Sequence, residues 1–328
     1  MTAPQRAGIL GLGFYLPEKV LTNQDLEKIV ETTDEWIRTR TGISERRIAA
    51  AGENTSDLAV GAARKALAAA GVSPEELDLI LVATMTPDMP CPATACLVQE
   101  KLGAHQAAAT DIAAACSGFV YGLVTASAFV NSGIYKRVLV VGAEVLSRVV
   151  DWKDRSTCVL FGDGAGAAVI GPSTQGEILS THLGSDGSKV DLLKVPGGGV
   201  GQPASHASVD SRAHFLKMNG SEVFKHAVRG MSEAAHVAIE KAGIRPEQIA
   251  CVVPHQANVR IIEAVVKHAK IPLEKVYLNV DRYGNMSAAS TIVALCEAVR
   301  DGRIKKGDYA LLVAFGAGLT WGSAVIRW

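Results

Sequence analysis

The sequence predicts an α/β protein built from two similar halves. Three observations predict this fold class. The chain has 328 residues, more than one hydrophobic core usually organises, so two domains or two fused halves are expected. One pattern of helix, turn and strand occurs twice, 172 positions apart, which indicates an internal repeat. Its strands are continuously apolar, which is typical of sheets covered by helices on both faces.

The repeat is clearest between residues 62–83, AARKALAAAGVSPEELDLILVA, and residues 234–255, AAHVAIEKAGIRPEQIACVVPH. Each copy predicts an amphipathic helix that ends at a glycine, a turn that a proline opens, and a short apolar strand. The matched positions are Gly71 and Gly243, Pro74 and Pro246, and Glu75 and Glu247.

Each half then continues with one helix and two further strands. The helices are predicted from Cys116 to about Gly133 and from about Met286 to Gly302. The strands are the apolar runs at 136–144 and 166–171 in the first half, and at 308–316 and 322–327 in the second. We therefore expect the halves to join near residues 172–180, with domains at 1–173 and 174–328.

Composition excludes several functional classes. Lysine plus arginine equals aspartate plus glutamate at 33 each, so no overall charge favours nucleic acid. No run of apolar residues predicts a membrane span, and the N-terminus lacks the apolar core of a signal peptide, so we expect a cytoplasmic location. The 6 cysteines form no C-x-x-C pair and have no histidine at ligand spacing, which predicts reduced thiols and neither zinc nor disulfides.

Cys116 is the first candidate for chemistry. It lies in TDIAAACSGFVYGLV, residues 110–124, where small neighbours leave room at the sulfur and a helix begins. The start of a helix presents unpaired N–H groups and the positive end of the helix dipole, which lower a thiol pKa and activate a nucleophile. The alternative is a small core hydrophobe, the role of most free cysteines.

His255 and Asn285 are predicted to lie near Cys116. His255 ends the strand VVPH, at the edge where open α/β sheets place ligand groups. Asn285, in DRYGNMSAAS, opens a helix 17 residues before Gly302, as Cys116 stands 17 residues before Gly133. Taken singly, the histidine reads as a satisfied surface group and the asparagine as a helix N-cap. Three such groups at matched element ends favour one shared site.

These motifs carry a resemblance that covers essentially the whole chain. The sequence resembles the thiolase-fold condensing enzymes, and most closely the β-ketoacyl-acyl-carrier-protein synthase III family. The matching stretches are TTDEWIRTRTGISERR (32–47), DIAAACSGF (111–119), LFGDGAGAAV (160–169), MNGSEVFK (218–225), VPHQANVRII (253–262), DRYGNMSAAS (281–290) and AFGAGLTWGSAVIRW (314–328). The resemblance implies a thiolase-like fold, in which two pseudo-duplicated α/β halves form a five-layered αβαβα core, and a homodimer.

The resemblance also implies a reaction and its catalytic residues. It implies the initiating step of type II fatty acid synthesis, in which an acyl-CoA primer condenses with malonyl-acyl carrier protein and carbon dioxide is released. Cys116 would carry the acyl group, while His255 and Asn285 would hold the malonyl thioester carbonyl during decarboxylation. The backbone N–H groups of Cys116 and Ala317 would form an oxyanion hole. Coenzyme A enters as a substrate thioester, and no cofactor or metal is implied.

Substrate-binding residues follow from the same matches. Trp36, Arg40 and Arg155 would clamp the adenine of coenzyme A, because an indole and a guanidinium can sandwich a base. Asn219, Gly220 and Asn258 would line the path of the pantetheine arm.

The primer pocket departs from the family pattern at Cys91. This position often carries an aromatic residue that reaches across the dimer, so the small cysteine predicts that primers longer or more branched than acetyl are accepted. The alternative is that other side chains close the pocket, namely Leu123, Phe161 or Phe224.

An acidic carrier protein requires a basic patch on this neutral chain. Two pairs at helical spacing are candidates: Lys225 with Arg229, and Arg260 with Lys267. The alternative is an ordinary solvated helix face.

Two other functions stay open at this stage. One is a thiolase-fold acyltransferase, or a specialised polyketide-type synthase, that passes the acyl group to another acceptor. The other is a catalytically silent binding subunit, which the intact Cys-His-Asn set disfavours. Carbon dioxide release from a malonyl substrate separates a condensing enzyme from a non-condensing acyltransferase and from the silent subunit.

Overall fold

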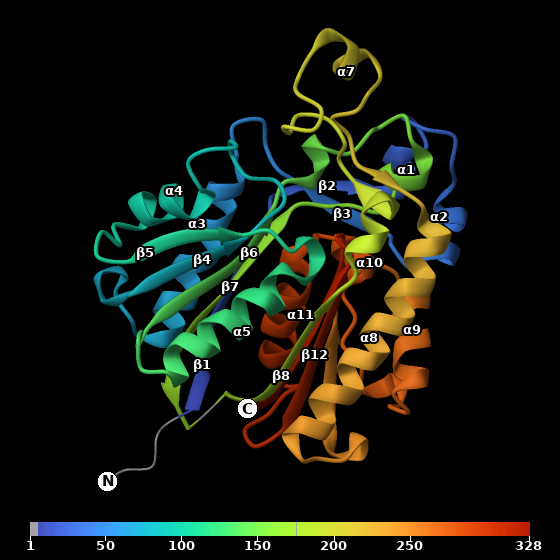
Figure 1. The fold of residues 1–328 in the computed structure, drawn as a ribbon. Coiled ribbons are helices and arrows are strands. Elements are labelled where there is room, and N and C mark those ends of the chain that lie inside the picture. Colours follow the sequence, from blue (N-terminus) through green and yellow to red (C-terminus); the bar gives the residue numbers. More distant parts are fainter. Residues whose placement is uncertain (1–5, 175) are drawn as a thin grey trace.

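The computed structural model describes residues 6–174 and 176–328, which form an α/β fold around one large sheet (Figure 1). In the described chain this sheet has 9 strands in the order β11-β12-β13-β8-β1-β7-β6-β4-β5. Its first-half strands are β1 (Arg6–Tyr15), β4 (Leu79–Ala83), β5 (Ala108–Ile112), β6 (Val138–Glu144) and β7 (Gly164–Ser173). Its second-half strands are β8 (Glu177–Ser185), β11 (Ile249–Pro254), β12 (Tyr309–Gly316) and β13 (Thr320–Arg327).

The strand pairing repeats between the halves. β1, β7 and β6 pair antiparallel in turn, and β6 pairs parallel with β4. In the second half, β8, β13 and β12 pair antiparallel, and β12 pairs parallel with β11. The duplicated topology that the sequence repeat predicts is therefore confirmed.

The helix–turn–strand repeat forms as predicted. Helix α3 (Thr55–Ala70) ends before Gly71, whose φ is 63°, and α8 (Gly220–Ala242) ends before Gly243, whose φ is 68°. Glycine adopts this left-handed conformation without a Cβ clash, so it ends both helices. A short 3₁₀ turn, Pro74–Glu76 or Pro246–Gln248, then leads into β4 or β11.

The helices complete five layers. Helices α3 and α4 (Thr94–Leu102) cover the outer face of the first-half strands, and α8 and α9 (Val259–His268) cover the outer face of the second-half strands (Figure 1). Helices α5 (Gly118–Asn131) and α11 (Ala288–Arg300) lie between and contact strands of both halves. The central hydrophobic cluster accordingly contains Phe119 of α5 and Ile292 of α11 together with strand residues of both halves. The five-layered αβαβα core is confirmed.

The halves share one continuous sheet because β1 and β8 are joined by a bridge between Gly8 and Glu177. The predicted junction, 172–180, contains the end of β7 and the start of β8, while its residue 175 lies outside the described residues. The division into domains at 1–173 and 174–328 stays a prediction.

The remaining elements surround the upper end of the sheet in Figure 1. They are β2 (Lys19–Thr22), β3 (Glu45–Ile48), β9 (Leu193–Lys194), β10 (Lys217–Met218), α1 (Asn23–Leu26), α2 (Asp34–Thr41), α6 (Arg155–Cys158), α7 (His206–Asp210) and α10 (Val280–Tyr283). None of the helices in the described residues is long and apolar enough to cross a membrane. The cytoplasmic location stays a prediction.

Candidate active site

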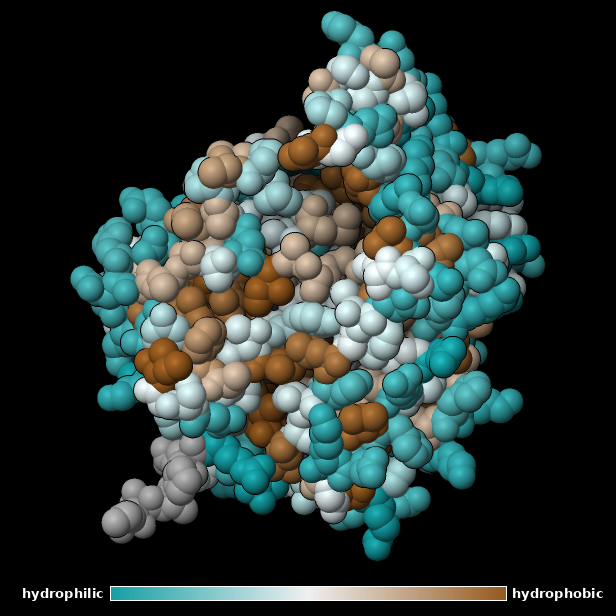
Figure 2. Space-filling view, viewed as in Figure 1, coloured by the Kyte–Doolittle hydropathy of each residue, from teal (hydrophilic) through white to brown (hydrophobic). Residues whose placement is uncertain are grey.

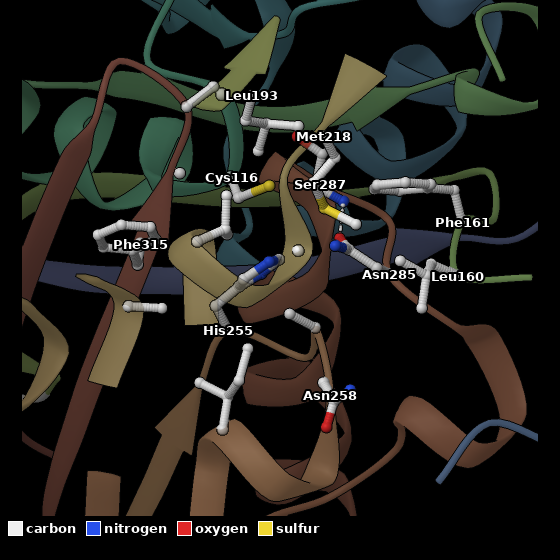
Figure 3. A pocket seen from close by; sticks show the side chains of 18 of the residues that line it. Cys116, Leu160, Phe161, Leu193, Met218, His255, Asn258, Asn285, Ser287 and Phe315 are labelled. Atoms are coloured by element: carbon white, nitrogen blue, oxygen red, sulfur yellow. Dashed lines mark hydrogen bonds between the residues drawn. The ribbon is translucent and has the colours of Figure 1, made fainter. Parts of the chain in front are cut away.

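Cys116, His255 and Asn285 line one cavity (Figure 3). The cavity encloses about 180 Å³. Cys116 lies in the 3₁₀ turn Ala115–Ser117 that leads into α5, His255 follows β11, and Asn285 precedes α11. All three are buried, with exposed fractions of 7%, 3% and 7%. The structure thus brings together, in a mostly apolar cavity, the three groups that the sequence places at matched element ends.

The backbone around Cys116 is tightly constrained. Ala115 has a φ of 45°, a left-handed conformation that is uncommon for a residue with a Cβ and is found at functional sites. The end of β12 packs directly on this turn: a Cβ added at Gly316 would lie 2.7 Å from the Cys116 backbone nitrogen. Ala317, the next residue, also lines the cavity. The predicted oxyanion-hole residues therefore meet because position 316 has no side chain.

The pKa of Cys116 departs from the sequence prediction. Burial raises the pKa of the thiol to about 12, although the polar side chains of Ser287 and Asn285 oppose this rise. The expectation of a lowered thiol pKa is wrong, because removing the thiolate from water outweighs the favourable groups around it.

His255 is held as a neutral imidazole. Its backbone N–H donates to the Val313 carbonyl at 2.8 Å, which fixes the residue beside the end of β12. Burial lowers the pKa of the ring to about 3, because a buried cation loses its hydration. A neutral imidazole has one N–H donor and one acceptor nitrogen.

Asn285 is oriented by the residues around it. Its backbone N–H donates to Leu160 O at 2.8 Å, and its side-chain Oδ1 accepts from Ser287 N at 2.8 Å (Figure 3). Because Oδ1 is engaged by the backbone, the amide offers its Nδ2 donor to other groups. Ser287 has a φ of 46°, so a second left-handed residue lies beside a candidate catalytic group.

Sequence reasoning missed the buried carboxylate of Glu144. It ends β6, is 0% exposed, and accepts hydrogen bonds from Thr86 Oγ1 at 2.5 Å and from Met85 N at 3.1 Å. Burial raises its pKa to about 7, opposed by the hydrogen bonds from Thr86 and Met85. Glu144 thus anchors the segment that brings Met85 to the cavity wall. A charged residue at the end of the apolar run VLVVGAE is the signal that could have found it.

The side chains of the predicted adenine clamp stack on one another in this structure. Trp36 of α2 has the guanidinium carbons of Arg40 and Arg155 each 4.8 Å from its ring centroid. A base could enter only if one guanidinium moved away. Asn258 Nδ2 donates to Arg40 O at 3.0 Å and also lines the cavity, so this clamp and the cavity are adjacent.

Only one of the other two residues predicted to line the path of the pantetheine arm lies at the cavity. Gly220 lines the cavity, whereas Asn219 is not among its lining residues. The Asn219 side chain instead caps the N-terminus of α8, accepting from Glu222 N at 3.4 Å. Its helix-capping role accounts for its place in the sequence.

Two of the four predicted primer-pocket residues line the cavity and two do not. Phe161 and Phe224 line the cavity. Leu123 does not: it lies on α5 with 0% exposure, packed in the central hydrophobic cluster, and its assignment to the pocket is wrong because that face of α5 meets the core. Cys91 is exposed and lies outside this protomer's cavity, so its contribution across a dimer stays a prediction.

The four predicted docking residues lie on the neighbouring helices α8 and α9 and are exposed: Lys225, Arg229, Arg260 and Lys267. Lys225 forms an ion pair with Glu222 at 2.7 Å, and this carboxylate offsets the positive charge that Lys225 would add to a basic patch.

Within residues 6–174 and 176–328, no three His, Cys, Asp or Glu side chains are grouped closely enough to hold a metal ion. The absence of a cofactor stays a prediction, and the chemistry below is derived from the cavity residues alone.

Comparisons with known proteins identify the family. Residues 110–187 match the family model described as 3-Oxoacyl-[acyl-carrier-protein (ACP)] synthase III, and residues 239–328 match the model of its C-terminal part. A β-ketoacyl-[acyl-carrier-protein] synthase III of Caldanaerobacter subterraneus is 58% identical over 98% of both chains. One of Clostridioides difficile is 57% identical over the same shares.

Solved structures agree with this match. The 3-oxoacyl-[acyl-carrier-protein] synthase III of Aquifex aeolicus has a TM-score of 0.91 and 52% identity, covering 98% of this chain and 100% of its own. The priming β-ketosynthase of the R1128 polyketide pathway has a TM-score of 0.92 and 38% identity, with coverage of 99% and 96%. Its fold, its cavity and these sequence similarities show that the chain belongs to the β-ketoacyl-[acyl-carrier-protein] synthase III family of condensing enzymes.

Proposed function

We propose that this enzyme initiates type II fatty acid synthesis by condensing a short acyl-CoA primer with malonyl-acyl carrier protein, with Cys116, His255 and Asn285 as its catalytic residues. The observation that carries the assignment is that these three side chains converge in one buried cavity, with the Asn285 amide oriented by Ser287. Family membership supports the reaction, and the geometry supports the roles.

In the first half-reaction, the Cys116 sulfur attacks the primer thioester. The new sulfur–carbon bond replaces the bond to coenzyme A, and the thiol proton leaves with the departing coenzyme A sulfur. The N–H groups of Cys116 and Ala317 are suited to hold the oxyanion of the tetrahedral intermediate. Because the thiol pKa is about 12, deprotonation must accompany attack, and the positive end of α5 stabilises the developing thiolate.

In the second half-reaction, the malonyl carboxylate leaves as carbon dioxide and its electron pair enters an enolate. A donor N–H of neutral His255 and Nδ2 of Asn285 would hydrogen-bond the thioester oxygen as charge develops there. The carbanion carbon then attacks the acyl-Cys116 carbonyl, and the sulfur departs as a thiolate that regains a proton. The apolar walls favour loss of a charged carboxylate as a neutral gas.

A homodimer forms part of the same proposal. β5 ends the sheet, and no strand of the described chain pairs with its outer edge, whereas the outer edge of β11 is covered by a bridge between Val252 and Val276. Apolar side chains gather on the face over α5, which contacts β5 (Figure 2). Ile134, just beyond α5, is 63% exposed. An open strand edge beside an apolar face favours pairing with a second copy. Light scattering should give twice the protomer mass of 34.4 kDa, and a protomer mass at micromolar concentration would contradict the dimer.

Acyl carrier protein and acyl-CoA are the proposed substrates, and the cytoplasm is the proposed location. Acetyl-CoA or a somewhat larger acyl-CoA, supplied with malonyl-acyl carrier protein, should give 3-oxoacyl-acyl carrier protein, carbon dioxide and coenzyme A. Product mass and carbon dioxide release test this directly. No carbon dioxide release with any primer would contradict the proposal.

A specialised polyketide-type role is the second candidate. The 38% identity to a priming β-ketosynthase of a polyketide pathway favours keeping it. The chemistry at Cys116 would be the same, and the carrier protein would differ. Comparing carrier proteins of the two pathways as malonyl donors distinguishes the candidates.

A further inference from the structure

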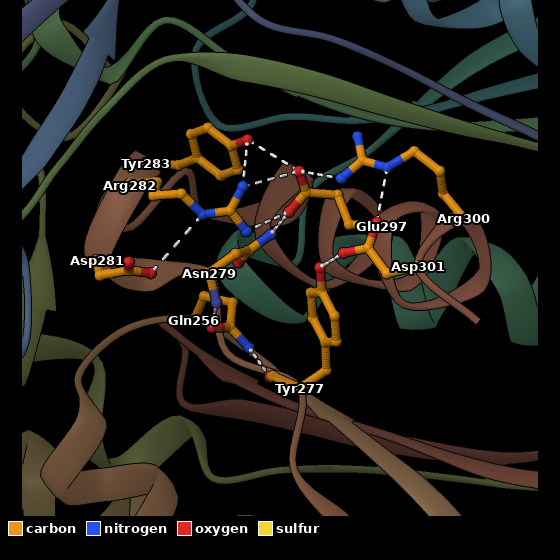
Figure 4. Close-up of polar contacts among 9 residues, drawn as sticks. All are labelled: Gln256, Tyr277, Asn279, Asp281, Arg282, Tyr283, Glu297, Arg300 and Asp301. Carbon is orange, nitrogen blue, oxygen red and sulfur yellow. Dashed lines mark hydrogen bonds and ion pairs between the residues drawn. The ribbon is translucent and has the colours of Figure 1, made fainter. Parts of the chain in front are cut away.

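The buried carboxylate of Glu297 accepts hydrogen bonds from the segment that precedes Asn285. Glu297 lies on α11 and is 1% exposed. It accepts hydrogen bonds from Asn279 Nδ2 at 3.0 Å, Arg282 Nη2 at 2.9 Å and Tyr283 Oη at 2.9 Å (Figure 4). These three donors lie within 279–283, the stretch that precedes Asn285. Glu297 therefore fixes that stretch against α11.

Asn279 extends the same connection to the segment that carries His255. The backbone N–H of Asn279 donates to Gln256 Oε1 at 3.0 Å (Figure 4). Gln256 Nε2 in turn donates to Pro254 O at 2.9 Å. Gln256 is 0% exposed and directly follows His255. Hydrogen bonds through Asn279 and Gln256 thus connect Glu297 to the backbone carbonyl of Pro254, the residue before His255.

Glu297 holds its negative charge in this buried position. Burial alone would raise its pKa, but the hydrogen bonds from Asn279, Tyr283 and Arg282 outweigh that effect and hold the pKa below its usual value. A buried charge is stable only where its donors stay in place. The carboxylate therefore resists displacement of either segment.

We propose that Glu297 is a positioning residue that sets the placement of Asn285 relative to His255. The proposal rests on the function proposed above, in which both side chains donate to one thioester oxygen. Two donors that converge on one atom tolerate little error, and a misplacement of about 1 Å can cost about a hundredfold in rate. Cys116 reaches the cavity from the 3₁₀ turn Ala115–Ser117, in the other half of the chain, so its acylation should not depend on Glu297.

Glu297→Gln tests this separation. The substitution preserves side-chain volume, removes the charge and turns an amide N–H toward groups that are themselves donors. We expect kcat for malonyl-acyl carrier protein decarboxylation to fall about ten- to a hundredfold, with a smaller change in KM, as expected for donors about 1 Å out of place. Acylation of Cys116 by primer-CoA should stay within about threefold of the wild-type rate, since only a transition-state contact of the other half-reaction is lost.

Tyr277→Phe is the matched control. Tyr277 Oη donates to Asp301 Oδ2 at 2.6 Å, so the variant loses one hydrogen bond at the end of the same helix. It removes none of the hydrogen bonds that Glu297 accepts, and both half-reactions should keep their wild-type rates. A general loss of packing at α11 would instead affect this variant as well.

Two further variants keep the test decisive. Glu297→Asp keeps the charge and should recover part of the decarboxylation rate. If Glu297→Gln does not fold, Asn279→Ser removes one donor and should lower decarboxylation alone. Unchanged decarboxylation in a folded variant, or equal loss of both half-reactions, would overturn the proposal. Absence of decarboxylation in the wild-type enzyme would contradict the proposed function instead.

Discussion

At the scale of single residues, the candidate site consists of three side chains that lie at the ends of helices and strands and line one buried cavity. Cys116, His255 and Asn285 were found because each follows or opens an apolar element, and such ends meet at one edge of a sheet. Leu123 was wrongly assigned to the pocket, because the sequence does not show which face of α5 packs against the hydrophobic core. The pKa of Cys116 was predicted in the wrong direction because desolvation depends on neighbours distant in sequence.

The division of labour between the catalytic residues is testable by alanine substitution. We expect His255→Ala or Asn285→Ala to lower malonyl decarboxylation by about a hundred- to a thousandfold, the usual effect of removing one oxyanion donor. Acylation of Cys116 should stay largely intact. The two rates are measured separately, as carbon dioxide release and as acyl-enzyme formation. An equal loss in both would count against the assignment.

The raised pKa of Cys116 predicts its response to pH. Because the folded-state pKa is about 12, the thiolate is the minor species at neutral pH and its fraction grows about tenfold per pH unit. Alkylation by iodoacetamide, followed by peptide mass spectrometry, should therefore accelerate from pH 6 to 9 without a plateau. A plateau below pH 8 would show that the thiol is activated before substrate binds.

At the scale of elements, glycine and proline positions predicted the boundaries well. Gly71 and Gly243 end their helices, and the prolines that follow begin the 3₁₀ turns. The left-handed conformations of Ala115 and Ser287 had no such signal, because neither residue type favours a positive φ. The network of Glu297 was equally hidden, since its partners come from several elements.

The face of α9 is the element proposed to meet the carrier protein. Arg260→Glu should raise KM for malonyl-acyl carrier protein severalfold and leave KM for primer-CoA unchanged, because charge reversal weakens attraction to an acidic partner. Arg64→Glu, on the exposed side of α3 in the opposite outer layer, serves as the control. An unchanged KM and salt dependence for Arg260→Glu would remove this patch from the account.

The loop between β4 and α4 is the element proposed to set primer length. Glu144 anchors its start, and Cys91 is exposed within it. Cys91→Phe should shift kcat/KM toward acetyl-CoA and away from butyryl-, isobutyryl- and octanoyl-CoA, since each excluded methylene is worth up to about 0.8 kcal/mol. An enzyme already strict for acetyl, with a silent Cys91→Phe, would assign the limit to the cavity residues Phe161 and Phe224.

At the scale of the whole molecule, the internal repeat predicted the architecture. Matched helices and strands in the two halves imply a common pairing order, and the structure has it. The bridge between Gly8 and Glu177 that merges the halves into one sheet was not predictable, because contacts between halves leave no periodic signal within either one. The shared sheet is what brings His255 and Asn285 of the second half to Cys116 of the first.

Acyl labelling tests the central claim most directly, namely that the two halves build one site around a nucleophilic Cys116. The enzyme is incubated with acyl-CoA alone and its peptides are analysed by mass spectrometry. We predict one acyl group per chain, on the peptide that contains Cys116, and none in Cys116→Ser. Labelling at Cys91 or Cys251, or no labelling in the wild-type enzyme, would contradict the account.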